Sequence, residues 1–350
     1  MNFSKTLIKW YLQNKRDLPW RNTTNPYHIW LSEIMLQQTR VAQGLPYFLS
    51  FTSSFPTVFD LANAHEEQVL KLWQGLGYYS RARNLHGTAK HIATELSGIF
   101  PGNYNDLLKL KGVGEYTAAA IASFSYNEVV PVVDGNVFRV LSRYFDIETD
   151  IASSGAKKEF TALAKELIPN DNPALFNQAI MEFGALQCVP KNPDCEICVL
   201  NSGCLALKYN KVNELPVKLK KTKVRNRYFH YLIFSDENQD VIIRKRIEKG
   251  IWHNLYEFPL VETEEDADFD AVSQLISEKY SGQYQIQSLV QLNQNKILHK
   301  LSHQHLFIDF YKVEVAGTIK DAVSYGTMIQ FPFPIVIFNF INDNRKFFLK

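Results

Sequence analysis

The amino-terminal part of the chain repeats its apolar residues every three or four positions. This spacing places the apolar side chains on one face of an α-helix and the polar ones on the other. The pattern therefore predicts a helical first domain. The clearest examples are the segments 66–76, 82–96, 157–168 and 174–187.

Beyond residue 226 the pattern changes to alternation and to short apolar runs, which are typical of strands. Segments 227–235 and 240–246 predict two strands joined by the polar turn 236–239. The acidic segment 261–280 predicts a loop leading into a helix, and 305–315 predicts another strand before the apolar carboxyl-terminal end. The second domain is therefore expected to be α+β.

A basic segment separates the two patterns. Residues 208–227 contain eight Lys or Arg residues and one Glu, without apolar periodicity. We predict domains at 1–209 and 227–350 with a linker at 210–226. Net charge is only +2, so a nucleic-acid footprint would be local. A solvated spacer is a simpler interpretation of this segment than a specific DNA contact.

The chain shows no signal for export or membrane insertion. Its amphipathic start lacks the apolar core of a signal peptide, and the longest apolar run, 331–341, is too short and proline-broken to span a bilayer. We expect a cytoplasmic protein without membrane contact, a compartment in which structural disulfides are rare.

All four cysteines lie within one short segment: Cys188, Cys195, Cys198 and Cys204. Four clustered thiols in an intracellular protein indicate a metal or cluster site. Structural zinc usually takes two Cys-x-x-Cys pairs, whereas only one is present here. Iron–sulfur clusters also take four thiolates, with more varied spacing. Composition alone leaves zinc and an iron–sulfur cluster equally open.

Residues 105–125 predict two helices joined by a tight turn. Gly112 and Gly114 permit backbone conformations that other residues avoid, and they expose amides at the start of a helix near Glu115. Such amides can bind a phosphate without reading base sequence. Taken alone, the motif fits a glycine-capped turn equally well.

Two carboxylates stand out by their surroundings. Asp134 lies where an extended apolar run becomes a helix, which is the position of an N-cap whose amides favour the ionised form. Glu33 has the helical neighbours Ile29, Trp30 and Leu36, so its carboxyl should be desolvated and its pKa raised. The ordinary alternatives are a purely structural cap and a glutamate paired with Gln37.

The motifs together resemble a known family. The cysteine spacing, with six, two and five intervening residues, resembles the 4Fe-4S loop of endonuclease III-like DNA glycosylases, and residues 105–125 resemble their helix-hairpin-helix. The sequences LPWR, SEIMLQQTRV and GLGYYSRARNLH further resemble the MutY-type adenine DNA glycosylases, from about Asn14 to Cys204. One departure is Lys111, where those proteins usually have proline.

This resemblance implies a multidomain fold, with an all-α helix-hairpin-helix glycosylase domain that contains a 4Fe-4S loop. It also implies a monomer, associated with the nucleoid, that acts on double-stranded DNA containing A:8-oxoguanine or A:G mispairs. Because adenine leaves deoxyribose easily only when protonated, the reaction needs a proton donor and a nearby anion. The base must first be flipped out of the duplex. By this resemblance, Glu33 is the general acid, Asp134 stabilises the cation, and Tyr116 and Asn136 arrange the sugar and catalytic groups. The adenine pocket is formed by Trp20, Arg21, Leu36 and Gln178. Tyr78 is a wedge in the base stack, Gln38 lies near the orphaned base, and Gly112 and Gly114 bind phosphate.

Tyr116 bears on the reaction type. Relatives that also cut the strand carry a lysine at this position, which attacks the sugar as an amine. Tyrosine cannot form a Schiff base, so the resemblance implies a monofunctional glycosylase. Lys109 and Lys111 lie close in sequence and leave weak lyase activity open.

Residues from about 227 onward resemble the Nudix-like domain attached to these glycosylases. The segment 250–262 matches the stretch that precedes the metal box in Nudix hydrolases, but no such box follows. Ser302 and His303 match a Phe-Ser-His loop that contacts 8-oxoguanine, with Leu301 in place of the phenylalanine. A metal site at His303 and His305 would lack a nearby cysteine or carboxylate.

Three functions are therefore compared. The leading hypothesis is hydrolysis of adenine from A:8-oxoguanine or A:G pairs. The alternatives are an endonuclease III-like glycosylase with lyase activity, which Tyr116 and the second domain disfavour, and a non-catalytic iron–sulfur protein that binds DNA. The non-catalytic alternative gives no reason for Glu33 to lie on an apolar face.

Overall fold

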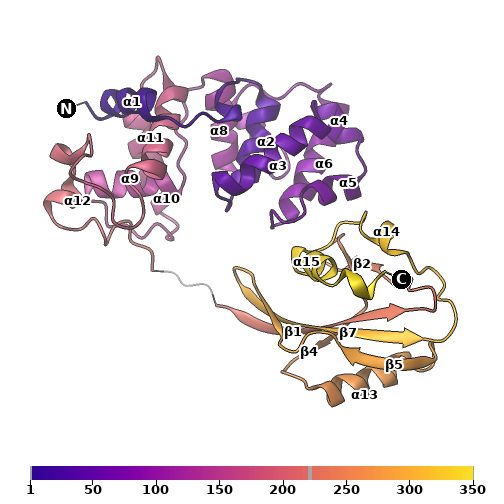
Figure 1. Ribbon diagram of the computed structural model, residues 1–350. Helices are drawn as coiled ribbons and strands as arrows, with labels where there is room; N and C mark the ends of the chain where they lie inside the picture. Colours follow the sequence, from indigo (N-terminus) through magenta and orange to yellow (C-terminus); the bar gives the residue numbers. More distant parts are fainter. Residues whose placement is uncertain (1, 220–222, 350) are drawn as a thin grey trace. The chain divides into compact units, whose positions relative to one another are not determined.

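A computed structural model describes residues 2–219 and 223–349. The chain divides into two compact units, coloured by sequence in Figure 1. Unit 1 comprises residues 1–63 and 84–220, and unit 2 comprises 64–83 and 221–350. The division between 220 and 221 falls inside the expected linker 210–226, whereas the grouping of segment 64–83 with the carboxyl-terminal residues was not expected.

Unit 1 is helical, as the apolar periodicity predicted. Apolar residues of α1, α9, α10 and α11 form one of its cores. The helix α2 is buried along most of its length and packs against α3 and α8. The α-helices of the chain are α1 Phe3–Asn14, α2 Pro26–Leu36, α3 Val41–Ser54, α4 Val58–Asn63, α5 Glu66–Leu72, α6 Ser80–Glu95, α7 Tyr104–Leu107, α8 Glu115–Tyr126, α9 Gly135–Phe145, α10 Ala156–Leu167, α11 Pro173–Leu186, α12 Leu205–Lys208, α13 Phe269–Tyr280, α14 Tyr325–Met328 and α15 Ile335–Asp343.

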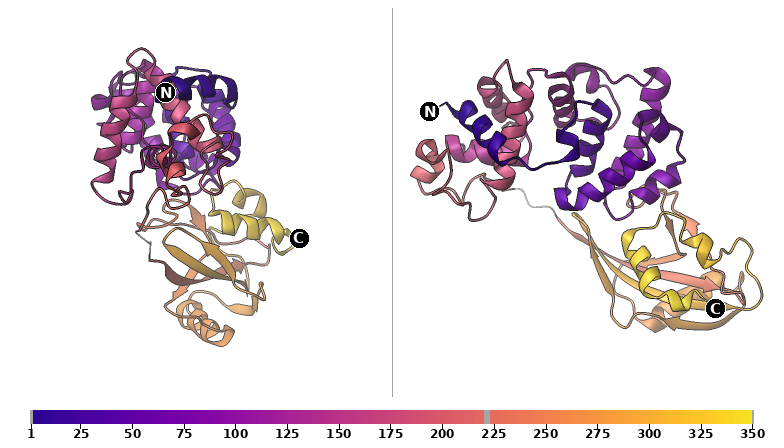
Figure 2. Two further views of the ribbon diagram at one scale, coloured as in Figure 1. Left: turned by 90° about the vertical axis from the view of Figure 1, so that its left-hand side faces the viewer. Right: turned by 45° about the horizontal axis from the view of Figure 1, so that its top comes forward.

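Unit 2 is built on a mixed sheet in the order β4-β1-β7-β5, with β6 also paired to β7. The central strands β1 and β7 are parallel, and the other pairings are antiparallel. Helices cover both faces of the sheet (Figures 1 and 2). On one face α13 packs through Val272 and Ile276. On the other face Phe340 of α15 stacks on Phe310, with ring centroids 3.7 Å apart. The strands are β1 Arg225–Ser235, β2 Arg244–Lys245, β3 Tyr256–Glu257, β4 Leu260–Thr263, β5 Ile286–Gln291, β6 Ile297–Lys300 and β7 Gln304–Val315.

The second predicted strand was wrong over most of its length. Within 240–246, Val241 forms isolated bridges to Ser235 and Val323, and the short strand β2 then pairs with β3. The predicted loop at the start of 261–280 was also wrong, because Val261 to Thr263 belong to β4, which pairs with β1. In both places the outcome depends on a partner distant in sequence, which local alternation does not reveal.

The segment predicted as a linker, 210–226, is partly structured. Lys211 bridges Asp146 and Glu148, and the carbonyl of Leu215 accepts a hydrogen bond from Arg143. The amide of Ile151 donates to Val217. Residues 220–222 of the expected linker lie outside the described residues, and β1 begins at Arg225.

The helices α9 and α11 approach each other closely at Gly184. A Cβ atom at this position would lie 2.7 Å from the Cβ of Asn136 and 2.9 Å from its carbonyl oxygen. The glycine therefore permits the contact between α11 and the first turn of α9, which follows Asp134.

We predict that Gly184→Ala lowers the free energy of unfolding by about 1–3 kcal/mol, because the added methyl overpacks this contact. Urea unfolding measures the effect. The matched control is Gly87→Ala on α6, where an added Cβ meets nothing within 4 Å. That control should raise stability by about 0.5–1 kcal/mol through helix propensity. Equal stability of the Gly184 variant and the native chain would contradict the close packing.

Candidate active site

A cavity of about 500 Å³ in unit 1 is lined by eight of the residues that the sequence predicted for catalysis or base binding. They come from the turn Pro19–Arg21 and from α2, α8, α9 and α11, together with the N-cap of α9. The fold thus gathers side chains spread over some 160 positions of sequence, so the cavity exists only once the helices are packed. The predicted residues among them are Trp20, Arg21, Glu33, Leu36, Tyr116, Asp134, Asn136 and Gln178.

Glu33 is the buried acid of this cavity. Its residue is 6% exposed, and its Oε2 accepts a hydrogen bond of 2.6 Å from the hydroxyl of Tyr116. Burial raises the pKa of Glu33 to about 7; the Tyr116 hydrogen bond lowers it, and the nearby Asp134 raises it. The carboxyl therefore titrates near neutral pH and can release a proton there, as its apolar helix face predicted.

Asp134 is the N-cap of α9, as predicted. Its Oδ1 accepts from the amide of Val137 at 2.8 Å, and its Oδ2 accepts from Nδ2 of Asn136 at 2.8 Å. Burial raises the pKa of Asp134 above its ordinary value and outweighs these hydrogen bonds. The net shift is opposite to the one expected from capping alone, because the sequence did not reveal how deeply the cap is buried.

Arg139 connects the catalytic end of α9 to two other segments. Its guanidinium donates to Oδ1 of Asn136 at 2.8 Å, to the carbonyl of Gly184 at 2.6 Å and to the carbonyl of Cys188 at 2.7 Å. The side chain that positions Asp134 is thereby tied to α11 and to the start of the cysteine loop.

The wall of the cavity also contains Glu182 paired with two arginines, an interaction that the sequence did not predict. Glu182 accepts hydrogen bonds from Arg16 and Arg21, each at 2.6 Å to Oε2. Although burial raises the pKa of Glu182, these hydrogen bonds lower it to about 2. Arg21 was predicted to line the base pocket, and its guanidinium is engaged by Glu182. The available signal was spacing, since Glu182 lies one helical turn after Gln178 on α11.

Gln178 and Trp20 are held in fixed orientations. The hydroxyl of Tyr11 donates to Oε1 of Gln178 at 2.7 Å. Trp20 is buried and packs edge-to-face on Phe48, with ring centroids 5.1 Å apart. Both lie on the cavity wall, so the cavity combines an aromatic surface with an oriented amide.

The structure places the other predicted residues elsewhere. Gln38 is exposed in the turn after α2, with a φ of 57°. In unit 2, Tyr78, Ser302 and His303 line a second cavity of about 510 Å³. The Oγ of Ser302 lies 3.1 Å from Nδ1 of His303, and His303 precedes β7 while His305 is within it. Among the described residues, no group of three or more His, Cys, Asp or Glu side chains is arranged to hold a metal ion.

The hairpin has the geometry that its glycines predicted. Gly112 has a φ of +76°, and its α-carbon lies against Asn84, where a side chain would not fit. Gly114 is the N-cap of α8. The amides at this helix start are thus available to bind a phosphate.

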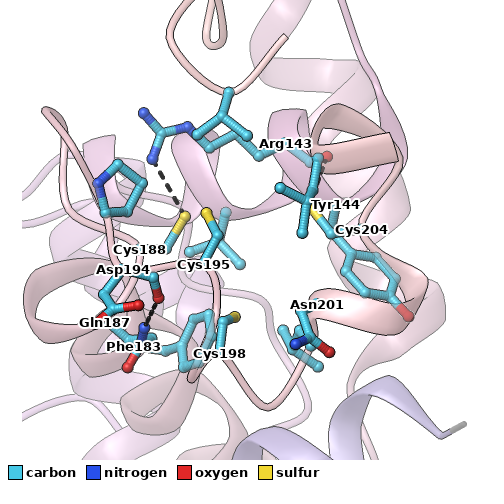
Figure 3. A pocket seen from close by; sticks show the side chains of 15 residues that line it. Arg143, Tyr144, Phe183, Gln187, Cys188, Asp194, Cys195, Cys198, Asn201 and Cys204 are labelled. Carbon is cyan, nitrogen blue, oxygen red and sulfur yellow. Dashed lines mark hydrogen bonds between the residues drawn. The ribbon is translucent and has the colours of Figure 1, made fainter. Parts of the chain in front are cut away.

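The four cysteines line one small cavity (Figure 3). All four are free thiols, and the guanidinium of Arg143 donates to Sγ of Cys188 at 3.4 Å. Burial raises the pKa of Cys198 to about 11 and also raises the pKa of Cys204. Four thiols in one cavity beside an arginine are a donor set whose chemistry suits a group that binds thiolates and carries negative charge.

Known protein families and relatives also match this chain. Residues 31–169 match the model of the HhH-GPD superfamily of base excision DNA repair proteins, and residues 230–343 match that of the NUDIX domain. The adenine DNA glycosylase of Buchnera aphidicola subsp. Schizaphis graminum is 39% identical over 75% of this chain and 75% of its own length. That of subsp. Baizongia pistaciae is 36% identical over 88% and 84%. The chain belongs to the adenine DNA glycosylase family.

The fold and the enzyme class predicted from sequence are therefore confirmed: this is a DNA glycosylase with a helix-hairpin-helix domain and a Nudix-like domain. A solved thermostable thymine-DNA glycosylase is 29% identical, with a TM-score of 0.55, over 59% of this chain and 95% of its own. Among the described residues, no helix is long and apolar enough to cross a membrane.

The hydrogen bond from Tyr116 makes a testable contribution to the acidity of Glu33. We predict that Tyr116→Phe raises the pKa of Glu33 above its native value of about 7, because the lost donor had favoured the carboxylate. Carbon-13 NMR titration of labelled glutamate carboxyls measures this pKa. The control is Tyr209→Phe on the exposed surface, which should leave the titration unchanged. A pKa that falls in the Tyr116 variant would contradict the assigned contact.

Proposed function

We propose that this glycosylase hydrolyses the N-glycosidic bond of adenine mispaired with 8-oxoguanine or guanine in double-stranded DNA, as a monofunctional enzyme. The observation that carries the proposal is the Glu33 carboxyl, which is buried beside Tyr116 and Asp134 in a cavity of about 500 Å³ and has a pKa of about 7. The named adenine DNA glycosylases to which the chain is similar support adenine as the base.

In the proposed reaction Glu33 donates its proton to a ring nitrogen of the extruded adenine. The bond between base and sugar then breaks, its electron pair leaves with the neutral adenine, and the sugar becomes an oxocarbenium ion. Water adds to that ion, and its proton returns to the Glu33 carboxylate. The products are free adenine and an abasic site, and the acid is restored.

Asp134 is proposed to stabilise the cation. Once Glu33 has given up its proton, the cationic sugar strongly favours an ionised neighbour, which offsets the cost of charge in a buried site. The amide of Val137 and the side chain of Asn136 keep the Asp134 carboxylate in place throughout.

Recognition of the base is assigned to Trp20, Leu36, Gln178 and Arg21. Trp20 and Leu36 provide apolar surface for a purine ring. Because Tyr11 occupies Oε1 of Gln178, the amide nitrogen is the group left to face a base as a donor. Arg21 would act through Glu182, whose carboxylate it holds.

Two features support hydrolysis without strand cleavage. Tyr116 stands at the hairpin position where a lysine would attack the sugar, and a phenol cannot form a Schiff base. Among the described residues that line the cavity, none is a lysine. Lys109 forms an ion pair with Asp106 on the exposed surface.

Reading of the opposite base is assigned to Tyr78, Gln38, Ser302 and His303. The extruded adenine is identical in correct pairs and mispairs, so selectivity must come from the base that remains in the duplex. Ser302 and His303 carry the polar groups that could hydrogen-bond an oxidised guanine edge, and Tyr78 is exposed and could enter the stack. The hairpin amides at Gly112 and Gly114 are proposed to hold the backbone of the duplex.

A 4Fe-4S cluster is proposed as the cofactor, held by Cys188, Cys195, Cys198 and Cys204. The donor set fits it, since four free thiols line one cavity and Arg143 would offset the charge of the thiolates. When bound, the cluster would fix the loop that follows α11 beside the carbonyls held by Arg139 and Arg143. We also propose that the enzyme is a monomer.

The function is tested on a duplex with a single A:8-oxoguanine pair, scored for strand breaks with and without alkali. We expect breaks only after alkali. In Glu33→Gln the rate should fall about 100- to 10,000-fold with mismatch binding retained, because the amide keeps the shape but has no acidic proton.

The matched control is Glu166→Gln on the exposed face of α10, which should leave the rate unchanged. Breaks without alkali would indicate a lyase. Breaks in neither condition would favour a non-catalytic DNA-binding protein, and near-normal turnover by Glu33→Gln would remove Glu33 from the mechanism.

The cofactor is tested by metal analysis of anaerobically purified protein. We expect a brown protein containing about four irons with matching sulfide per chain. The Cys198→Ser variant should lose this iron and have a lower free energy of unfolding. Colourless native protein with one zinc would contradict the cluster.

A further inference from the structure

The segment that carries Tyr78 belongs structurally to the carboxyl-terminal unit. Residues 64–83 lie inside the stretch that matches the helix-hairpin-helix superfamily, yet they group with residues 221–350 in one compact unit. The segment comprises α5, the start of α6 and the loop between them, with Tyr78 in that loop. Some group of contacts must therefore hold this loop on the Nudix-like fold.

Lys71, in the last turn of α5, makes the most unusual of these contacts. Its Nζ donates to the carbonyls of Ile329 at 2.6 Å and Phe331 at 3.0 Å, and it lies 4.6 Å from the ring centroid of Phe338 on α15. Ile329 is the C-cap of α14, where helix carbonyls have no partner within the helix. The ammonium group thus caps one element of the Nudix-like fold from outside it.

Burial disfavours the charged form of this ammonium group and lowers the pKa of Lys71 to about 8. The hydrogen-bond acceptors of Nζ are two backbone carbonyls and the amide oxygen of Gln74, all of them neutral. The three acceptors bind the ammonium group through directional hydrogen bonds, and these fix the position of the end of α5. The contact does not involve a strong ionic attraction.

Other residues of segment 64–83 also form hydrogen bonds with the Nudix-like fold. Glu67 accepts from Tyr256 at 2.7 Å and from Lys245 at 2.9 Å. The remaining hydrogen bonds are Asn254 to Glu66 at 2.6 Å, the amide of Phe333 to Gln74 at 3.0 Å, Tyr79 to the carbonyl of Phe333 at 3.4 Å, and Arg83 to the carbonyl of His253 at 2.8 Å.

The loop after α5 is also held by hydrogen bonds of its own. Nε1 of Trp73 and the guanidinium of Arg81 both donate to the carbonyl of Gly77, at 2.9 Å and 3.1 Å. Tyr78 follows in a left-handed conformation with φ of 48° and is 48% exposed. It lines the same cavity as Ser302 and His303, so the docking of α5 sets the distance between the tyrosine and that loop.

We propose that Lys71, supported by Glu67, is a positioning residue for lesion selectivity. It fixes the position of the Tyr78 loop relative to the loop of Ser302 and His303. Insertion into the base stack and reading of the opposite base are then done by one rigid element. The proposal rests on the proposed function, in which these two loops read the mispair.

The test compares single-turnover adenine release from A:8-oxoguanine and A:G duplexes. Lys71→Met keeps the aliphatic stem but removes every donor. We expect its A:8-oxoguanine rate to fall about tenfold, the loss of one good base contact, while its A:G rate changes by less than about twofold. Lys71→Arg keeps the charge and the donors and should retain most of the preference. Lys90→Met, at an exposed position of α6, is the matched control and should keep both rates.

A mutant cycle separates positioning from general damage. Lys71→Met introduced into a Ser302→Ala, His303→Ala chain should cause no further loss of preference, because the register no longer matters there. Additive losses, equal losses on both duplexes, or a full preference in Lys71→Met would each overturn the proposal. If Lys71→Met does not fold, Tyr256→Phe decides, since it removes only the hydroxyl bound to Glu67 and should lower the preference by a smaller factor. A native enzyme without preference for 8-oxoguanine would refute the assignment of Ser302 and His303 as readers of the lesion, whatever the Lys71 variants do, while adenine release itself would still support the proposed function.

Discussion

The contact between the buried carboxyl of Glu33 and the hydroxyl of Tyr116 is the constraint on which the site depends. A carboxyl that is 6% exposed must either be neutral or have strong partners. Tyr116 provides a single hydrogen bond, and Asp134 adds negative charge nearby. Burial therefore prevails, and the proton stays on Glu33 up to about neutral pH. The packing of α2 against α3 and α8 matters because Glu33 is buried on this helix.

Two arginine centres, one with the buried Arg139 and one with the half-buried Arg16 and Arg21, hold the walls of the cavity around that carboxyl. Arg139 joins Asn136, and through it Asp134, to α11 and to the start of the cysteine loop. Arg21 and Arg16 join the amino-terminal segment to Glu182 on α11. Both centres end on α11, so this helix is the element that relates the base pocket to the catalytic pair. A cluster in the cysteine loop would stabilise the same helix from its carboxyl end, which gives a structural reason for a cofactor remote from the chemistry.

The sequence predicted what local chemistry determines. The cap at Asp134, the glycine turn at Gly112 and the apolar face around Glu33 each depend on residues within one helical turn, and the structure has all three. Contacts between distant segments were not predictable. Glu182 has no local sign of its two arginine partners, and Lys71 sits in an ordinary amphipathic helix whose acceptors lie 258 and 260 residues away. The direction of the pKa shift at Asp134 was missed for the same reason, since burial comes from packing.

The proposed mechanism depends above all on desolvation, which keeps Glu33 protonated near neutral pH so that it can act as the acid. The most direct test is the pH dependence of single-turnover adenine release from an A:8-oxoguanine duplex with saturating enzyme. We expect a rate that is high on the acid side and falls about tenfold per pH unit above an inflection at the pKa of Glu33, about 7. A rate that stays level or rises through pH 7 to 9 would contradict it, because the chemistry would then proceed with Glu33 ionised.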